Sequence, residues 1–313
     1  MVTELGQWFS DLNLELLRVT RPSKFLFLCG GARETRPKAR AANLRDYILR
    51  VRPFRTPHTI VLAEEATQLF RDTAYDDLIT FEEDIARIAA VVLVIAESAG
   101  SLAELGAFTA NDTIRESLRV VIPHHHETAE SFVRYGPIQR LKNEKRGKLG
   151  VYPWTVHASG GLNVSSIRPH YGSLVSFIRE NLDNTPTSIP YKNLNESRLF
   201  YIVYWIIYVS VAITPSVLYE CVRSIEPGAD DKQIRNKVYC LQLAKWIERY
   251  SYSDNDYFFA RFSDEPFVYR YKTGVGETSN IRRKLAVADA LRKIHPIPRY
   301  VSRIANEARG SIA

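Results

Sequence analysis

The chain has 313 residues, of which 45% are hydrophobic and 25% are charged. This is an ordinary globular composition, and the length is sufficient for two domains. The three cysteines are odd in number and show no Cys-x-x-Cys spacing, which argues against a disulfide framework and a zinc site and fits a reducing cytoplasm. With 42 basic and 35 acidic residues, the chain carries a net charge of +7.

One uncharged segment, residues 199–219, has the length of a membrane span. Four tyrosines and the helix-breaking Pro215 interrupt it, so the unbroken part, 200–213, is too short to span and predicts a buried helix. Residues 1–20 mix acidic and polar side chains with apolar ones and contain no small-residue cleavage site, so we expect no signal peptide. The sequence therefore predicts a cytoplasmic protein that does not enter a membrane.

The first half of the chain alternates between helical and strand patterns. Apolar residues recur at helical spacing in the helices, whereas the strands are continuous apolar runs, which are typical of strands buried on both faces. We expect helices over 5–17, 41–51, 76–90, 104–118 and 172–181, strands over 25–29, 59–63, 91–95 and 119–122, and a loop over 33–40. This alternation predicts an α/β fold with a doubly wound parallel sheet over residues 1–182.

A second, smaller domain is expected over residues 196–313, after a linker at 183–195 that contains two prolines and several Asn, Ser and Thr residues. We expect helices over 196–213, 215–225 and 230–250, and then strands over 257–262 and 267–271 that pair as a hairpin. Three helices and a hairpin predict a winged-helix domain.

The positive charge is concentrated at the end of the chain, where residues 281–313 hold 8 basic and 2 acidic residues. Such a tail is an electrostatic footprint for nucleic acid, although many basic tails are only solvated faces. The candidate phosphate contacts are Arg282, Arg283 and Lys284 on a predicted helix, together with Lys232, Arg235 and Arg270.

Two strands of the predicted sheet end in features of a binding site. The run from Phe25 to Cys29 ends in Gly30 and Gly31, and the run from Val91 leads into a small-residue turn and a helix that carries Glu104. In open parallel sheets, ligands bind beyond the carboxyl ends of the strands. We therefore expect both strand ends to face one crevice that contains Glu104.

The motifs Phe-Leu-Cys-Gly-Gly and Glu-Ser-x-Gly-Ser-x-x-Glu-Leu-Gly-Ala-Phe, at residues 27–31 and 97–108, resemble the nucleoside 2-deoxyribosyltransferase-like fold. With Ser131-Phe132 and Tyr135-Gly136-Pro137 following in order, the chain resembles the effector proteins of retron antiphage systems over residues 24–140. In those effectors a glycosidase-like domain is joined to a C-terminal winged-helix-like domain.

The resemblance implies a toxic N-glycosidase that cleaves a nucleotide, with NAD hydrolysed to nicotinamide and ADP-ribose as the leading reaction. NAD is then a substrate, and no cofactor is expected. The implied partners are the retron reverse transcriptase and its multicopy RNA-linked single-stranded DNA, which hold the effector inactive in a higher-order assembly. The residues alone do not distinguish NAD from a nucleoside, so a nucleoside deoxyribosyltransferase or hydrolase, and a non-enzymatic nucleotide-sensing DNA regulator, stay open as alternatives.

The resemblance makes Glu104 the candidate catalytic residue, because a carboxylate below the glycosidic carbon stabilises or attacks the developing oxocarbenium ion. The alternative is a surface glutamate that the helix dipole favours. Glu97 and Ser98 are candidates for binding ribose hydroxyls, and Gly100 and Ser101 for binding phosphate. An equally good interpretation makes Ser101 the N-cap of the helix, with Glu104 completing a capping box.

The remaining candidates lie at the first two strand ends. Gly30 and Gly31 are expected to line the pocket, with Cys29 as a buried small residue beside them. Glu64 is a candidate second acid or sugar ligand, or else an exposed loop residue. One departure from the fold family is Ala89-Ala90, where an aspartate often precedes the third strand.

Three consecutive histidines, residues 124–126, follow Pro123. They cannot all face one ion from regular structure, and no acidic or cysteine cluster accompanies them, so we expect no metal site.

Overall fold

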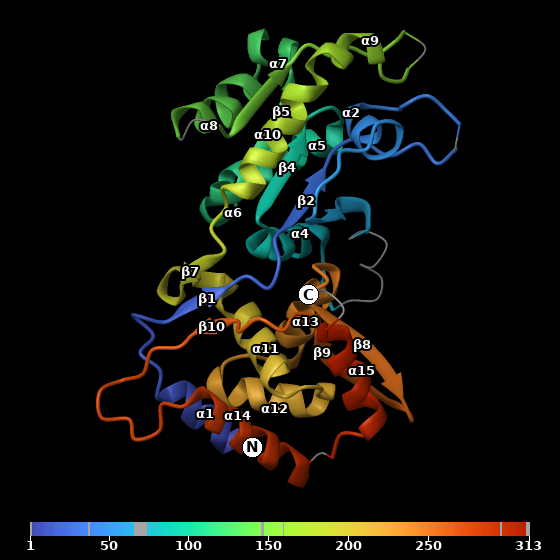
Figure 1. The fold of residues 1–313 in the computed structure, drawn as a ribbon. Coiled ribbons are helices and arrows are strands. Elements are labelled where there is room, and N and C mark those ends of the chain that lie inside the picture. The colour runs from blue at the N-terminus through green and yellow to red at the C-terminus, as the bar shows by residue number, and fades with distance from the viewer. Residues whose placement is uncertain are drawn as a thin grey trace. The chain divides into compact units, whose positions relative to one another are not determined.

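A computed structural model describes residues 2–36, 38–65, 74–144, 147–158, 160–294 and 296–310. The chain divides into two compact units (Figure 1). The first, which we call the sheet unit, comprises Lys24–Arg71 and Asp77–Thr185. The second, the C-terminal unit, comprises Met1–Ser23, Asp72–Asp76 and Pro186–Ala313.

The sheet unit contains a five-stranded parallel sheet in the order β3-β2-β4-β5-β6. Its strands are β2 (Phe25–Cys29), β3 (Thr59–Leu62), β4 (Val91–Ile95), β5 (Leu118–Pro123) and β6 (Leu149–Tyr152). Every residue of the central strands β2 and β4 is buried, as their uninterrupted apolar sequences predict. The predicted α/β class with a parallel sheet is confirmed. The edge strand β6 was not predicted, because it has only four residues and contains Gly150.

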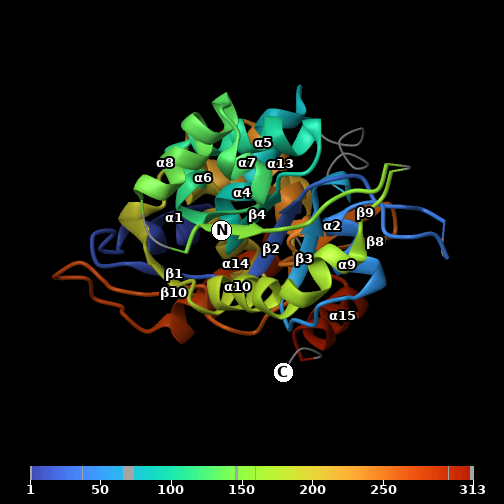
Figure 2. The same cartoon turned by 90° about the horizontal axis from the view of Figure 1, so that it is seen from above.

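Helices cover both faces of this sheet (Figure 2). On one side lie α4 (Leu78–Ile88), α5 (Ala99–Ala110) and α6 (Asp112–Ser117), and on the other lie α2 (Leu44–Asp46), the π-helix η1 (Tyr47–Val51) and α10 (Tyr171–Asp183). The unit also contains α7 (His124–Thr128), η3 (Arg134–Ile138), α8 (Gln139–Asn143), α9 (Val164–Ile167) and η4 (Arg168–His170).

The helix predicted over 104–118 is two helices. Ser98 caps α5, which therefore begins five residues before Glu104, and Asn111 caps α6 by accepting from two backbone N–H groups. Sequence periodicity missed the earlier start because Ala99 and Gly100 carry no side chain that reports a helical face.

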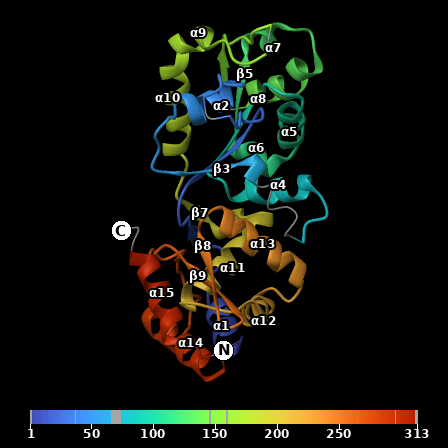
Figure 3. The ribbon, with the colours of Figure 1, turned by 90° about the vertical axis from the view of Figure 1, so that its right-hand side faces the viewer.

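The C-terminal unit contains three helices followed by a hairpin (Figure 3). The helices are α11 (Arg198–Val209), α12 (Pro215–Ile225) and α13 (Asp231–Leu243), and the hairpin is formed by β8 (Ile247–Tyr252) and β9 (Asn255–Ala260). Two more helices, α14 (Asn280–Ile294) and α15 (Arg299–Gly310), follow. The uncharged segment forms the core helix α11, in which all ten residues from Phe200 to Val209 are buried. Among the described residues, no helix combines the length and apolar character of a membrane span.

The predicted hairpin is wrong in its pairing. The helix expected over 230–250 ends at Leu243, and Lys245 adopts a left-handed backbone conformation before β8 begins. Ser253 and Asp254 both have positive φ, and this two-residue turn matches the twist of a hairpin and pairs β8 with β9. The strand expected over 267–271 is β10 (Phe267–Val268), which pairs instead with β1 (Arg18–Thr20).

The compact units also differ from the predicted domains at their ends. The helix expected over 5–17 is α1 (Val2–Ser10), and it belongs to the C-terminal unit together with β1. The segment expected to be a linker contains β7 (Ser188–Pro190), η5 (Tyr191–Asn193) and part of η6 (Asn195–Ser197). The strands β1, β7 and β10 form one antiparallel sheet, so main-chain pairing from distant parts of the sequence ties residues 18–20 to this unit.

Candidate functional site

The candidate site lies where the order of the parallel strands changes direction. From β2 the chain proceeds to β3 on one side, and β4 then pairs with the other side of β2. The connections that leave the carboxyl ends of two neighbouring strands run to opposite faces of the sheet at such a switch point, which is where open α/β sheets bind ligands. Gly30 and Gly31 follow β2, and Glu97 and Ser98 follow β4, so the structure brings both predicted strand ends together at this point.

The Glu97 carboxylate joins these strand ends to the start of α2. Its Oε2 accepts from Leu44 N at 2.7 Å, and its Oε1 accepts from Arg45 N at 3.0 Å and from Gly31 N at 3.4 Å. Burial raises the pKa of Glu97 to about 7, against the lowering effect of these hydrogen bonds. Since both oxygens are engaged by the main chain, the geometry gives Glu97 a positioning role, whereas the sequence suggested a ribose ligand.

The two glycines permit close packing against the α2 segment. A Cβ at Gly30 would lie 2.8 Å from Arg45 Cδ, and one at Gly31 would lie 2.5 Å from Asn43 Nδ2. Asn43 is the N-cap of α2, and its amide donates to Ala32 O at 2.6 Å. The close approach of protein side chains is therefore sufficient to require glycine here, and the predicted role of both glycines in lining a pocket stays a prediction.

Arg45 is the central cation of the site and was not a candidate from the sequence. Its side chain is 3% exposed and donates to Gly31 O at 3.2 Å and to a carboxylate oxygen of Glu64. The other oxygen of Glu64 lies 3.1 Å from Nε of Arg33. Glu64, predicted as a second acid or a loop residue, is thus an ion-pair partner that holds Arg45 in place.

The turn after β4 is a helix cap. Ser98 Oγ accepts from Ser101 N at 3.2 Å, and Ser101 Oγ accepts from Ser98 N at 2.9 Å and from Glu97 N at 3.0 Å. The capping box is therefore Ser98 with Ser101, and Gly100 lies in the first helical turn. The predicted alternative, in which Ser101 is the N-cap and Glu104 completes the box, is wrong, so capping does not explain the presence of Glu104.

The Glu104 carboxylate lies one turn further along α5 and is partly buried. Burial raises its pKa, while the Arg45 guanidinium acts in the opposite direction. Its Oε2 atom is buried and has no hydrogen-bond partner within the described part of the chain. A buried carboxylate oxygen without a partner costs stability, and such costs are typical of groups retained for function.

A second carboxylate, Glu82 on α4, interacts electrostatically with Glu104. It was not predicted from the sequence. Burial, and then the charge of Glu104, raise the pKa of Glu82 to about 8. Burial and both carboxylates also raise the pKa of the Cys29 thiol, which is fully buried and therefore remains neutral. A sequence clue existed, because Glu82 directly follows Phe81 of the buried helix face and lies three residues before Ile85.

The predicted nucleic-acid contacts fall into two groups in the C-terminal unit. Arg283 lies 2.6 Å from Asp11 and is 11% exposed, and Lys284 pairs with Glu265, so both are engaged within the protein. The other four are exposed, namely Arg235, Arg270, Arg282 near Glu277, and Lys232, which pairs with Asp76 at 2.6 Å.

The Tyr-Gly-Pro motif lies in η3, where Pro137 and Ile138 are buried and Tyr135 is exposed, and Phe132, which precedes η3, is exposed as well. His124, His125 and His126 lie in α7. Across the described ranges, no group of three His, Cys, Asp or Glu side chains is arranged to hold a metal ion.

The fold and the site define a parallel α/β protein with acidic side chains and a buried arginine at its switch point. The profile of the STM3845 retron effector protein family matches residues 41–249, and the chain belongs to this family. Two Escherichia coli relatives are each 28% identical, over 128 and 121 residues. They are described as "Retron Ec73 putative ribosyltransferase/DNA-binding protein" and "Retron Ec86 putative ribosyltransferase/DNA-binding protein". The similarity covers 39% and 37% of their lengths, and the same shares of this chain.

Proposed function

We propose that this retron effector is an N-glycosidase whose toxic activity is the hydrolysis of NAD to nicotinamide and ADP-ribose. The observation that carries the proposal is the Glu104 carboxylate, which is partly buried, lies at the switch point and has one oxygen without a hydrogen-bond partner among the described residues. The description of two relatives as ribosyltransferases supports chemistry at a ribosyl carbon. The proposed site of action is the cytoplasm.

In the proposed reaction, Glu104 is ionised and lies below the anomeric carbon. The bond from that carbon to the nicotinamide nitrogen breaks, and its electron pair leaves with the nicotinamide. Glu104 stabilises or captures the resulting oxocarbenium ion, and water then supplies the hydroxyl of ADP-ribose and releases a proton. Arg45 favours the ionised form of Glu104, and Glu64 and Glu97 hold Arg45 and the α2 segment in position.

The protonation state of Glu82 distinguishes NAD from nucleosides as substrates in this proposal. With a pKa of about 8, Glu82 retains its proton at neutral pH and is suited to act as an acid. Nicotinamide leaves NAD as a neutral molecule and requires no proton, whereas a purine that leaves a nucleoside does. Removal of this acid should therefore impair nucleoside cleavage far more than NAD cleavage.

The proposed partners are the reverse transcriptase and the RNA-linked single-stranded DNA of the retron, which would hold the effector inactive in a larger assembly. Membership in a retron effector family and the DNA-binding description of the two relatives support this part of the proposal.

The test is product analysis by chromatography after incubation of the purified protein with NAD or with deoxynucleosides. We expect nicotinamide and ADP-ribose, and a loss of about 10³-fold or more in Glu104→Gln, which keeps the shape but not the charge. Glu116→Gln, an exposed change on α6, is the matched control. Wild-type turnover by a folded Glu104→Gln protein would exclude the mechanism. Conversion of deoxynucleosides alone would establish a deoxyribosyltransferase or nucleoside hydrolase, and nucleotide binding without turnover would establish a regulator.

A further inference from the structure

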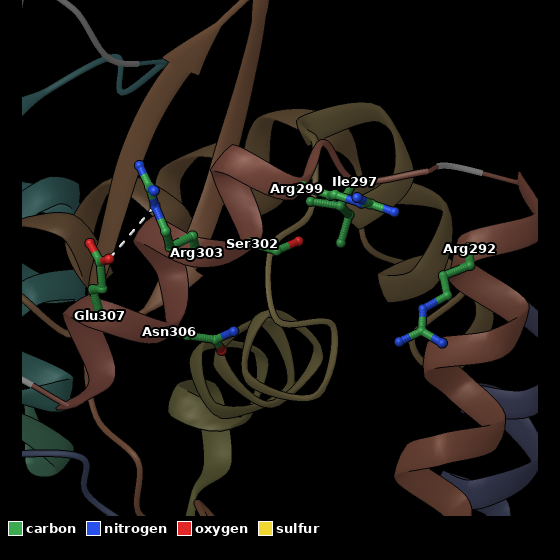
Figure 4. A pocket seen from close by; sticks show the side chains of 7 residues that line it. All are labelled: Arg292, Ile297, Arg299, Ser302, Arg303, Asn306 and Glu307. Carbon is green, nitrogen blue, oxygen red and sulfur yellow. Dashed lines mark ion pairs between the residues drawn. The ribbon is translucent and has the colours of Figure 1, made fainter.

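A basic cavity lies between the last two helices of the C-terminal unit. It has a volume of about 960 Å³ and is lined by side chains of α14, of α15 and of the segment between them (Figure 4). The polar groups that line it are Arg292, Arg299, Ser302, Arg303, Asn306 and Glu307. Three arginines and two uncharged hydrogen-bonding side chains against one carboxylate suit an anionic ligand.

The amphipathic pattern of α15 creates this polar wall. Arg299 is four residues before Arg303, and Ser302 is four residues before Asn306, so these four side chains lie on one helix face. Val301 and Ala305 are fully buried on the opposite face, where they pack in a cluster with Tyr257 and Phe259 of β9. The arginines are thus displayed on a helix that its apolar side anchors to the hairpin.

The cations of the cavity are more available than Arg283 and Lys284, which are engaged within the protein. Arg292 is 77% exposed and lies 3.3 Å from Asp289, and Arg303 is 64% exposed and lies 3.7 Å from Glu307. Exposed pairs of this kind contribute little stability, so a phosphate can replace the carboxylate at small cost. Arg299 is exposed and forms no ion pair with any residue that the structure describes. By contrast, Arg283 is largely buried in its ion pair.

Exposed aromatic rings adjoin these arginines. Tyr300 of α15 lies 5.9 Å from Tyr252 and 6.3 Å from Tyr250, both on β8, measured between ring centroids. The guanidinium of Arg303 lies 5.0 Å from the Tyr300 ring centroid, so Tyr300 contacts a residue that lines the cavity. Tyr300 is 45% exposed and Tyr252 is 37% exposed. Arginines combined with exposed aromatic rings are typical of sites that bind single strands, because phosphates pair with the cations and unpaired bases stack on the rings.

We propose that the cavity between α14 and α15, together with Tyr252 and Tyr300, binds single-stranded nucleic acid. The phosphates contact Arg292, Arg299 and Arg303, and the bases stack on the two tyrosines. This inference locates one partner of the proposed function, but it requires no glycosidase activity. It also moves the main contact away from residues 282–284, which the sequence favoured.

The experiment measures binding of labelled single-stranded and duplex DNA of about 20 nucleotides by fluorescence anisotropy at several salt concentrations. The full chain carries Glu104→Gln, so that turnover, assayed separately on the wild-type protein, does not affect the result. We expect the triple variant Arg292→Gln, Arg299→Gln, Arg303→Gln to bind single strands at least 10-fold more weakly. The slope of log affinity against log salt should decrease by up to about 2, because each phosphate contact contributes about 0.7.

Two further variants make the result specific. The control triple variant Arg140→Gln, Lys142→Gln, Lys192→Gln removes the same charge from other exposed ion pairs and should retain both affinity and slope. Tyr300→Leu should weaken single-strand binding but not duplex binding. An unchanged slope in the cavity variant, or an equal loss in the control, would overturn the proposal. Binding of polyglutamate in preference to single-stranded DNA would also overturn it, because the cavity would then recognise an acidic protein.

Discussion

Because the folded protein keeps Glu82 protonated, we expect its stability to fall as the pH rises. Its pKa is about 8 in the folded protein, against an ordinary value of 4.5. At a pH between these two pKa values, Glu82 is ionised in the unfolded chain but protonated in the folded protein. Its contribution to the free energy of unfolding therefore falls with increasing pH. The substitution Glu82→Gln removes the titration and should abolish this part of the pH dependence.

The size of the effect follows from the shift and from the exposure of the side chain. A group with a shifted pKa changes the free energy of unfolding by up to about 1.4 kcal/mol per pH unit, which gives an upper limit of about 5 kcal/mol for Glu82. Because Glu82 is partly exposed, solvent reduces this value, and we expect roughly 2 kcal/mol. The free energy of unfolding of Glu82→Gln minus that of the wild type should thus be roughly 2 kcal/mol larger at pH 9 than at pH 5.

The assay is urea unfolding followed by circular dichroism from pH 5 to pH 9, applied to the wild type, Glu82→Gln, Glu104→Gln and the double variant. Because the charge of Glu104 is one cause of the raised pKa of Glu82, Glu104→Gln should reduce the pH dependence, and the two substitutions should not be additive. Glu116→Gln serves as the exposed control. Parallel stability curves for the wild type and Glu82→Gln would refute the raised pKa of Glu82, and additive effects of the two substitutions would refute its interaction with Glu104.

Three further measurements test the site. Gly31→Ala should lower stability by about 2–4 kcal/mol, because a Cβ there would displace the Asn43 cap. Gly100→Ala, in an open first helical turn, should raise stability by about 0.5 kcal/mol. Thermal unfolding of the two variants checks the difference in sign. Cys29 should react with a thiol reagent only after unfolding, since it is fully buried, and peptide mapping of the alkylated protein with and without urea tests this. In substrate assays, Glu82→Gln should retain most NAD cleavage while losing any nucleoside cleavage by about 10²-fold or more, and equal losses on both substrates would contradict its assignment as an acid.

The sequence by itself determined the class of the sheet unit. Continuous apolar runs such as Val91–Ile95 are typical of strands covered on both faces, so the runs and the helical spacing between them predicted a parallel α/β sheet. Glu104 became a candidate because it follows a strand that ends in small residues and because this motif resembles that of a known family, and its catalytic role stays a prediction. The core helix α11 could be predicted as well, since a charge-free segment interrupted by Pro215 has few other solutions.

Only the tertiary structure decided which side chains meet. Arg45 and Glu82 lie on helices that follow and precede different strands, and no local pattern reports their approach to Glu104. Glu97, Gly30 and Gly31 make hydrogen bonds and close contacts with residues more than ten positions away in the chain, so spacing alone could not predict these contacts. The pairing of β10 with β1 likewise joins segments about 250 residues apart. Local periodicity determines the elements because it reflects burial within one turn or one strand, whereas pairing and site geometry depend on which distant surfaces pack together.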